Sequence, residues 1–262
     1  MTPPAGGCGE MHGAAPLNEQ RASDRATGSS DLGNVLVVMD FDGTITTDDC
    51  MEAVLSRHVV GWRSIAAAAR AEGLSDLAVI ERGVHLLRLP REQIVGSFID
   101  LTELRPGFQA FAEWVLAGEG RAAVASAGIR EAIEAVWRAA DLPCVPVYAS
   151  ELLGTAESGF RLVPHERFGD CPICGRRRCK GALTRSLRRA DDVVVAFGDG
   201  ARDLCMAREA DLVFARGRLL ELCERDGIAA MVFEDFGHAA ADVTAWLRRD
   251  AGRSRPASTP GR

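Results

Sequence analysis

The chain has 262 residues, of which 47% are hydrophobic and 26% are charged. This composition is that of an ordinary globular protein, and it excludes a fibrous repeat or a wholly disordered chain. With 31 Lys and Arg against 37 Asp and Glu, the net charge of −6 gives no general attraction to nucleic acid or to an anionic membrane. No apolar run reaches the ~18 residues of a membrane span, and no secretory leader pattern opens the chain. We therefore expect a cytoplasmic protein with no membrane partner.

Short apolar runs and polar turns predict the fold of the central part of the chain. Residues 1–33 and 250–262 lack an apolar period, so both are predicted to be disordered tails. Between them, runs at 35–39, 122–125 and 193–197 predict buried strands. Each run ends in a polar turn and continues into a helical pattern. Repeated strand, turn and helix units predict a Rossmann-like α/β fold, a parallel sheet flanked by helices, whose three turns converge at the carboxyl ends of the strands.

A helical segment interrupts this core after its first strand. Apolar spacing typical of helices covers 51–60, 62–72, 76–87 and 92–100, with breaks at Gly61, Gly73 and Pro90. We interpret 50–104 as an inserted helical domain, and 34–49 together with 105–249 as the core. A further helix is predicted over 108–116, and two β-like stretches between 145 and 163 flank Glu157-Ser158-Gly159, which predicts a hairpin.

Polar residues that can do chemistry follow each of the predicted strands. Asp40 and Asp42 lie in the first turn, where two carboxylates can share a hard cation, or one can attack while the other transfers protons. Such a pair alone is common in loops and helix caps. Ser126 follows the second strand, Lys180 begins a later helix, and Gly198-Asp199-Gly200-Ala201-Arg202-Asp203 follows the third. The order and spacing of the set point to one site.

In this order the motifs resemble those of the haloacid dehalogenase superfamily of phosphotransferases. They correspond to Asp40-x-Asp42-Gly43-Thr44, Ser126, Lys180 and Gly198-Asp199-Gly200-x-x-Asp203. The resemblance covers nearly all of 34–240, and it implies that the helical insert is a C1-type cap, as in phosphoserine phosphatase-like members (subclass IB). A closer likeness is to the subgroup that hydrolyses 2-hydroxy-3-keto-5-methylthiopentenyl-1-phosphate. It rests on residues 40–46 with 48–49, 105–108 with 113–114, 179–180, and 210–215 with 233–236.

The resemblance implies a Mg²⁺-dependent phosphatase that acts on a small phosphorylated metabolite. Asp40 would attack phosphorus to form an aspartyl phosphate, which divides one difficult displacement into two easier ones. Asp42 would protonate the leaving oxygen and later activate water. The Mg²⁺ ligands would be Asp40, the main-chain carbonyl of Asp42, and Asp199.

The remaining motif residues would bind phosphate or support the site. Lys180 and the Ser126 hydroxyl would hold the phosphoryl oxygens, assisted by N–H groups around Gly43. The supporting residues would be Thr44, Gly198, Gly200 and Asp203. Of these, Asp203 would orient either Lys180 or the waters on the metal, and its direct contact with the ion is left open.

Several of these residues also have an ordinary structural interpretation. Ser126 could cap a helix, Lys180 could be a solvated charge, and Thr44 could serve the turn. Asp48 and Asp49, where the insert begins, could meet substrate or cap its first helix.

A cysteine cluster precedes Lys180. Cys171, Cys174 and Cys179 combine a C-x2-C spacing with a third thiol, a pattern typical of zinc sites, although no fourth ligand lies nearby in the sequence. His165, Cys144 or a distant side chain could complete a tetrahedron. The two alternatives are a structural Zn²⁺ site and free thiols in a substrate loop.

The same region is basic. Residues 161–190 contain nine Lys or Arg against two Asp or Glu, a local excess of +7. The excess could attract an anionic substrate. Because aromatic side chains are not interleaved with the cations, we do not expect a nucleic-acid partner.

These patterns predict a phosphatase whose cap closes over substrate and excludes water. One alternative keeps the mechanism but changes the substrate to phosphoserine or another small metabolite of a biosynthetic pathway. A second is a zinc-stabilised binding protein without turnover, against which the intact set of Asp40, Asp42, Lys180 and Asp199 argues.

Overall fold

The strand β1 (Val35–Met39) lies at the centre of the structure, and all five of its side chains are buried. The computed structural model describes residues 32–171, 173–175 and 178–251. Leu32 lies in the core and the last helix ends at Ala251, so the folded part extends slightly beyond the predicted limits of 34 and 249. The remainder of the predicted tails, 1–31 and 252–262, lies outside the described residues.

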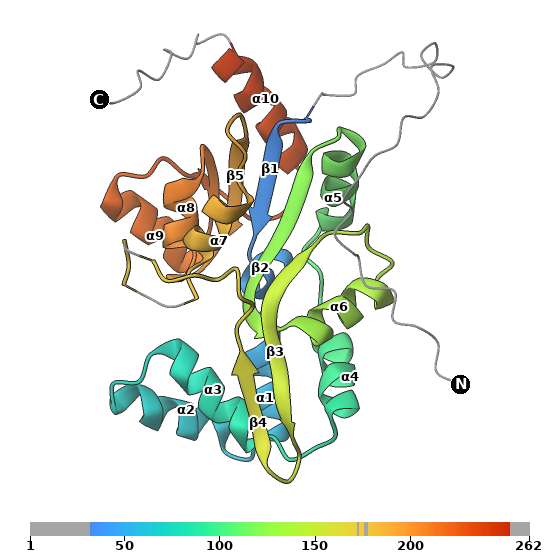
Figure 1. The fold of residues 1–262 in the computed structure, drawn as a ribbon, viewed down its shortest axis with the longest axis vertical. Coiled ribbons are helices and arrows are strands. Elements are labelled where there is room, and N and C mark those ends of the chain that lie inside the picture. The colour runs from blue at the N-terminus through green and yellow to red at the C-terminus, as the bar shows by residue number, and fades with distance from the viewer. Residues whose placement is uncertain (1–31, 172, 176–177, 252–262) are drawn as a thin grey trace.

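Seven strands form one sheet in the order β4-β3-β2-β1-β5-β6-β7. The strands β1 to β5 are labelled in Figure 1. Neighbouring strands are parallel, except for the antiparallel hairpin of β3 and β4. Met39 of β1 pairs with Val124 of β2 and with Phe197 of β5, so the three predicted strands are adjacent. The second strand continues to Ile129, so Ser126 lies within it and not in a turn after it. The predicted Rossmann-like α/β fold is confirmed. The other strands are β2 (Arg121–Ile129), β3 (Val147–Thr155), β4 (Gly159–Val163), β5 (Val193–Gly198), β6 (Leu212–Ala215) and β7 (Met231–Val232).

Helices cover both faces of this sheet, which explains why its central strands are continuously apolar. Val37 and Met39 belong to the core shared with α5, α6 and α10, whereas Leu36 and Val38 pack with α7 and α8 on the other face. On that second face, α9 packs with α8 against β6. These helices are α5 (Phe108–Ala117), α6 (Arg130–Ala139), α7 (Lys180–Leu187), α8 (Leu204–Glu209), α9 (Gly217–Asp226) and α10 (Ala239–Ala251).

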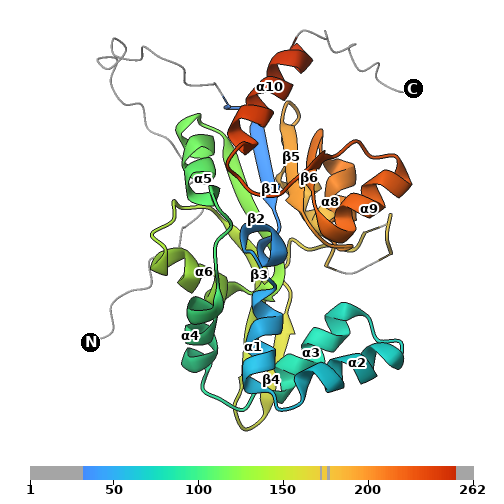
Figure 2. The same ribbon diagram turned by 180° about the vertical axis from the view of Figure 1, so that it is seen from behind.

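Four helices lie beyond the carboxyl end of the sheet, between β1 and α5 in the sequence (Figure 2). Their bounds agree with the predicted segments to within two residues. α4 packs along α6, where Arg91 pairs with Glu131 at 2.8 Å. The four are α1 (Cys50–His58), α2 (Trp62–Ala71), α3 (Asp76–Leu86) and α4 (Arg91–Leu101).

The chain leaves the core and returns to it through two paired segments. Thr46 forms an antiparallel bridge with Leu104, and the Arg105 N–H donates to the Ile45 carbonyl at 2.8 Å. This pairing fixes the helical insert directly beside the turn after β1.

The hairpin of β3 and β4 extends past the sheet and lies against α3 (Figures 1 and 2). A Cβ on Gly159 would come within 2.7 Å of the His85 carbonyl oxygen, so only glycine allows this approach. The hairpin therefore supports the insert, although the sequence assigned it to the core. None of the helices in the described residues is long and apolar enough to cross a membrane.

Candidate active site

The turn after β1 places two carboxylates at the carboxyl edge of the sheet. Asp40 accepts a hydrogen bond from the Phe41 N–H at 2.7 Å, and Asp42 accepts one from the Cys50 N–H at 3.0 Å. The tight turn Phe41–Ile45 depends on Gly43, whose φ of +73° is favourable only for glycine. A Cβ at Gly43 would also lie 2.3 Å from the Asp199 Oδ2. The glycine therefore brings the turns after β1 and β5 into contact.

Lys180 and Asp203 form a buried ion pair beside Asp40. The Lys180 Nζ lies 2.5 Å from the Asp40 Oδ1 and 2.6 Å from the Asp203 Oδ1. The other oxygen of Asp203 accepts hydrogen bonds from the N–H groups of Asp199 and Gly200 at 3.1 and 3.0 Å. Gly198 permits the close approach, since a Cβ there would lie 2.7 Å from the Asp203 Cβ. Asp203 thus orients Lys180 and shapes the turn, with both of its oxygens engaged.

Ser126 also points into this group. Its hydroxyl is buried and accepts the Gly128 N–H at 2.9 Å, while α6 begins after Ile129 with no side-chain cap. The helix-cap interpretation of Ser126 is therefore wrong. The solvated-charge interpretation of Lys180 is wrong as well, because this side chain is 3% exposed.

The structure also shows where the remaining residues singled out in the sequence lie. Thr44 is fully buried, and its carbonyl accepts a hydrogen bond from Arg105. Asp49 caps α1 by accepting the Glu52 N–H at 2.8 Å, and Asp48 and Asp49 both line the cavity described below. Cys171, Cys174 and Cys179 lie together, with Cys205 as a fourth member that the sequence did not identify.

Burial and crowding of carboxylates shift the protonation of the site. Burial, followed by the charge of Asp49, raises the pKa of Asp42 to about 7, within the range of a general acid or base near neutral pH. Burial and the charge of Asp203 raise the pKa of Asp199 to about 6. Burial also raises the pKa of Asp40, although Lys180 opposes this shift. For Lys180, burial would lower the pKa, but the charges of Asp203 and Asp40 raise it, so the ammonium remains protonated.

The donor set fits a hard divalent cation. Carboxylate oxygens of Asp40, Asp199 and Asp203 lie within 4.8 Å of one another. Lys180 is in direct contact with Asp40 and Asp203. Because one ammonium group does not balance these three carboxylates and Asp42, the site keeps an excess of negative charge. Oxygen donors without sulfur or imidazole are those that Mg²⁺ favours. Because Asp203 is fully buried and committed to Lys180 and backbone N–H groups, Asp40 and Asp199 have the freer oxygens.

The carboxylates open into a cavity of about 500 Å³ between the core and the helical insert. The core side supplies two arginines, Arg202 and Arg216, and eight of the predicted site residues: Asp40, Asp42, Gly43, Ser126, Lys180, Asp199, Gly200 and Asp203. Thr44 and Gly198 do not line the cavity. The insert contributes three apolar residues from α1 and α3, namely Met51, Leu77 and Ile80. Polar residues of the insert at its edge are Glu52, Arg70 and Asp76.

Arg105 is a supporting residue whose role the sequence did not reveal. Its guanidinium is buried and donates to the carbonyls of Gly43, Thr44 and Thr46 at 2.8, 2.8 and 2.9 Å. It also donates to the Glu234 carbonyl at 3.0 Å. Its planar fork therefore ties the turn after β1 to the C-terminal part of the core. The Arg105-Pro-Gly-Phe segment is part of the family resemblance, but only the fold shows which carbonyl oxygens the Arg105 guanidinium contacts.

Three arginines of the basic segment before β5 form ion pairs with acidic side chains. Arg178 pairs with Glu81 of α3 at 2.6 Å, Arg185 pairs with Glu209, and Arg188 pairs with Asp211 at 2.8 Å. These pairs connect the segment to neighbouring helices and strands, as expected for a folded part of the molecule.

The chain matches the model of the haloacid dehalogenase-like hydrolases over residues 37–208. It is 31% identical to a 2-hydroxy-3-keto-5-methylthiopentenyl-1-phosphate phosphatase of Bacillus cereus, over 80% of this chain and 96% of that protein. A protein of the same name from an Exiguobacterium species is 27% identical over 81% of this chain and 96% of its own length.

Solved phosphoserine phosphatases share the fold. One, captured as an analogue of a phospho-aspartyl intermediate, has a TM-score of 0.59 and 19% identity, and covers 81% of this chain and 98% of its own. A probable phosphoserine phosphatase from Vibrio cholerae has a TM-score of 0.62 and 20% identity, over 86% of this chain and 69% of its own.

Proposed function

The chain belongs to the haloacid dehalogenase-like hydrolase family and is a phosphatase, and from this premise we propose that it hydrolyses 2-hydroxy-3-keto-5-methylthiopentenyl-1-phosphate by Mg²⁺-dependent attack of Asp40. The observation that carries the proposal is the convergence of Asp40, Asp42, Lys180 and Asp199 on one cavity to which the insert adds three apolar side chains as well as charged ones.

In the first half of the proposed reaction, a carboxylate oxygen of Asp40 attacks phosphorus, and the bond from phosphorus to the substrate oxygen breaks. Asp42 donates its proton to that leaving oxygen. Lys180, which already lies 2.5 Å from Asp40, and the Ser126 hydroxyl hold phosphoryl oxygens, together with backbone N–H groups around Gly43.

In the second half, Asp42 removes a proton from a water molecule that attacks phosphorus. The bond between Asp40 and phosphorus breaks, which releases inorganic phosphate and restores both carboxyl groups. Asp40, the Asp42 carbonyl and Asp199 would hold Mg²⁺, which when bound would neutralise charge on the transferred phosphoryl group. Asp203 acts as a positioning residue, because its contact with Lys180 fixes the ammonium near Asp40.

The cap wall supports the choice of substrate. Met51, Leu77 and Ile80 line the cavity opposite the carboxylates, and such side chains suit a methylthio group and its hydrocarbon chain. Phosphoserine would instead bring an ammonium and a carboxylate to this wall. Arg70, the cation of the insert at the cavity, is already paired with Asp76 at 3.1 Å.

The test measures phosphate release from 2-hydroxy-3-keto-5-methylthiopentenyl-1-phosphate and from phosphoserine, with and without Mg²⁺. We expect the methylthio substrate to have the higher kcat/KM, with turnover abolished by removing Mg²⁺ and by Asp40→Asn. Leu77→Ala should lower kcat/KM for this substrate roughly tenfold, because it removes apolar contacts. Leu86→Ala, in the same helix but not among the residues lining the cavity, serves as the control. A preference for phosphoserine would overturn the substrate assignment, and full activity of Asp40→Asn would overturn the mechanism.

A further inference from the structure

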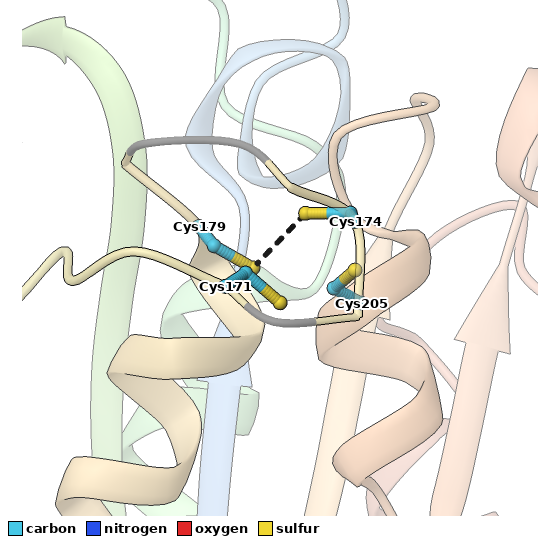
Figure 3. A group of neighbouring side chains, drawn as sticks. All are labelled: Cys171, Cys174, Cys179 and Cys205. Carbon is cyan, nitrogen blue, oxygen red and sulfur yellow. Dashed lines mark hydrogen bonds between the residues drawn. The ribbon is translucent and has the colours of Figure 1, made fainter.

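A second group of metal-binding side chains lies next to the phosphate site. The Sγ atoms of Cys171, Cys174, Cys179 and Cys205 all lie within 4.8 Å of one another (Figure 3). Cys171 and Cys174 lie in the segment before α7, Cys179 directly precedes α7, and Cys205 is in the first turn of α8. All four are free thiols, and neither His165 nor Cys144, considered above as a fourth ligand, belongs to this group.

The backbone is arranged to bring these thiols together. The Gly175 N–H donates to the Cys171 carbonyl at 2.8 Å, and Gly175 has a φ of +64°, so a tight turn joins the first two cysteines. Arg178, directly before Cys179, has a φ of +65°, a conformation that is uncommon and costly for a residue other than glycine. Such a conformation persists only where the surrounding structure requires it.

The approach of Cys205 depends on the packing of α7 on α8. A Cβ on Gly181 would lie 2.6 Å from the Cys205 carbonyl oxygen, so the first turn of α7 lies directly on the backbone of Cys205. This packing explains how Cys179 and Cys205, which are 26 positions apart in the sequence, become neighbours.

The size and chemistry of the group match a tetrahedral thiolate site. Zinc–sulfur bonds of about 2.3 Å require sulfur atoms separated by about 3.8 Å, and Sγ of Cys174 lies 3.8 Å from Sγ of Cys179. Cys171, Cys179 and Cys205 are each at most 5% exposed, so the group is closed to solvent on most sides. Four sulfur donors favour Zn²⁺ over Mg²⁺, in contrast to the oxygen donors around Asp40.

Two arginines lie near the group, and each is also paired with a carboxylate, Arg185 with Glu209 and Arg208 with Asp226. Four thiolates around one divalent cation carry a net charge of −2, and the Arg185 Nη2 lies 4.0 Å from the Cys171 Sγ. Arg208 lines the small cavity beside Cys174, Cys179 and Cys205.

We propose that Cys171, Cys174, Cys179 and Cys205 bind one structural Zn²⁺ ion, which fastens the segment before α7 to the start of α8. Both attachment points adjoin the phosphate site, because Cys179 precedes Lys180 and Cys205 follows Asp203 by two residues. Arg178, next to Cys179, also pairs with Glu81 of α3. The ion therefore stabilises the arrangement of Lys180, Asp203 and the helical insert without taking part in phosphate chemistry.

The test is metal analysis of the full-length protein, purified without chelator. We expect about one zinc per chain, retained after dialysis against Mg²⁺, and a tetrahedral thiolate absorption spectrum when Co²⁺ replaces it. Cys205→Ala should lose the zinc and this spectrum. Cys223→Ala, at a buried free cysteine of α9 outside the group, should keep both.

Because Cys205 is buried, loss of zinc in Cys205→Ala alone does not distinguish the loss of a ligand from misfolding. A second variant makes this distinction. Cys174→Ala changes a half-buried cysteine, and its circular dichroism should remain native while zinc content falls at least several-fold. A zinc chelator that does not react with thiols should lower the Tm of the wild type by several degrees and leave that of Cys174→Ala unchanged. Wild-type protein without zinc, or with a Cys174–Cys179 disulfide in its place, would overturn the proposal, as would Cys205→Ala with a full zinc content. None of these readouts depends on phosphatase activity.

Discussion

Gly43 of the candidate site is constrained both by its backbone conformation and by a close neighbour. Its φ of +73° favours glycine, and the Asp199 carboxylate occupies the space that a Cβ would need, at 2.3 Å. Asp199 belongs to the turn after β5, so the contact sets the distance between the two acidic turns. A side chain at this position would displace a candidate metal ligand in addition to straining the backbone.

Gly43→Ala should therefore lower kcat by about 100-fold, since displacements near 1 Å in a catalytic group have effects of that size. The left-handed backbone should also cost roughly 1 to 2 kcal/mol of unfolding free energy. Gly61→Ala is the matched control, because Gly61 has a φ of +72° but no atom within 4 Å of the added Cβ. Urea unfolding should show similar destabilisation of both variants, with phosphate release lost only in Gly43→Ala. Equal activity of the two variants would show that the Gly43–Asp199 contact is unimportant.

Among individual residues, those in short motifs could be predicted from the sequence, and those that act through the fold could not. Asp40 and Asp199 directly follow β1 and β5, Lys180 begins α7, and Ser126 lies in the last part of β2, so the topology of the sheet brings them to the same edge. Arg105 acts on backbone carbonyls far away in the chain, for which no sequence pattern exists. Cys205 lacks a cysteine neighbour in sequence and joins its group only through the packing of α7 on α8.

At the scale of elements, the packing of α7 against α8 connects the candidate phosphate site with the cysteine group. Lys180 begins α7, and Asp203 directly precedes α8. Gly181 provides the contact surface, because its missing side chain leaves room for the Cys205 backbone. The distance between these helices therefore determines how Lys180 meets Asp203.

Gly181→Ala should push the two helices apart. Alanine is favoured over glycine in a helix by about 1 kcal/mol, but forcing a methyl group against rigid backbone costs about 1 to 3 kcal/mol. We expect the cost of the clash to exceed the gain in helix propensity, because the obstructing atoms belong to the backbone. Gly181→Ala should therefore have a lower Tm and slower phosphate release. Gly96→Ala in α4, where the added Cβ meets no atom within 4 Å, should instead raise the Tm. A rise in Tm for Gly181→Ala with full activity would contradict the packing described.

The bounds of helices could be predicted where glycine or proline interrupts the apolar pattern. The position of the β3–β4 hairpin against α3 could not be predicted. Gly61, Gly73 and Pro90 delimit the helices of the insert because glycine and proline end helices locally. Periodicity also predicted strands near β3 and β4. That these strands extend beyond the sheet and support α3 depends on the fit of Gly159 against His85, a contact between segments far apart in sequence.

At the scale of the whole molecule, the cavity between core and insert combines two chemical surfaces. The carboxyl edge of the sheet contributes carboxylates and Lys180, and the insert contributes the apolar side chains of Met51, Leu77 and Ile80 beside Glu52, Arg70 and Asp76. The paired segments at Thr46 and Leu104 hold the insert beside the acidic turn. This arrangement suits a substrate with a phosphate at one end and an apolar group at the other.

The proposed mechanism requires that Asp40 becomes phosphorylated during turnover. The most direct measurement is rapid acid quenching of the full-length protein with substrate and Mg²⁺, followed by peptide mapping by mass spectrometry. We predict a phosphoryl group on the peptide containing Asp40, absent from Asp40→Asn and from samples without Mg²⁺. Steady turnover with the phosphoryl group on another residue, or wild-type rates in Asp40→Asn, would contradict the account.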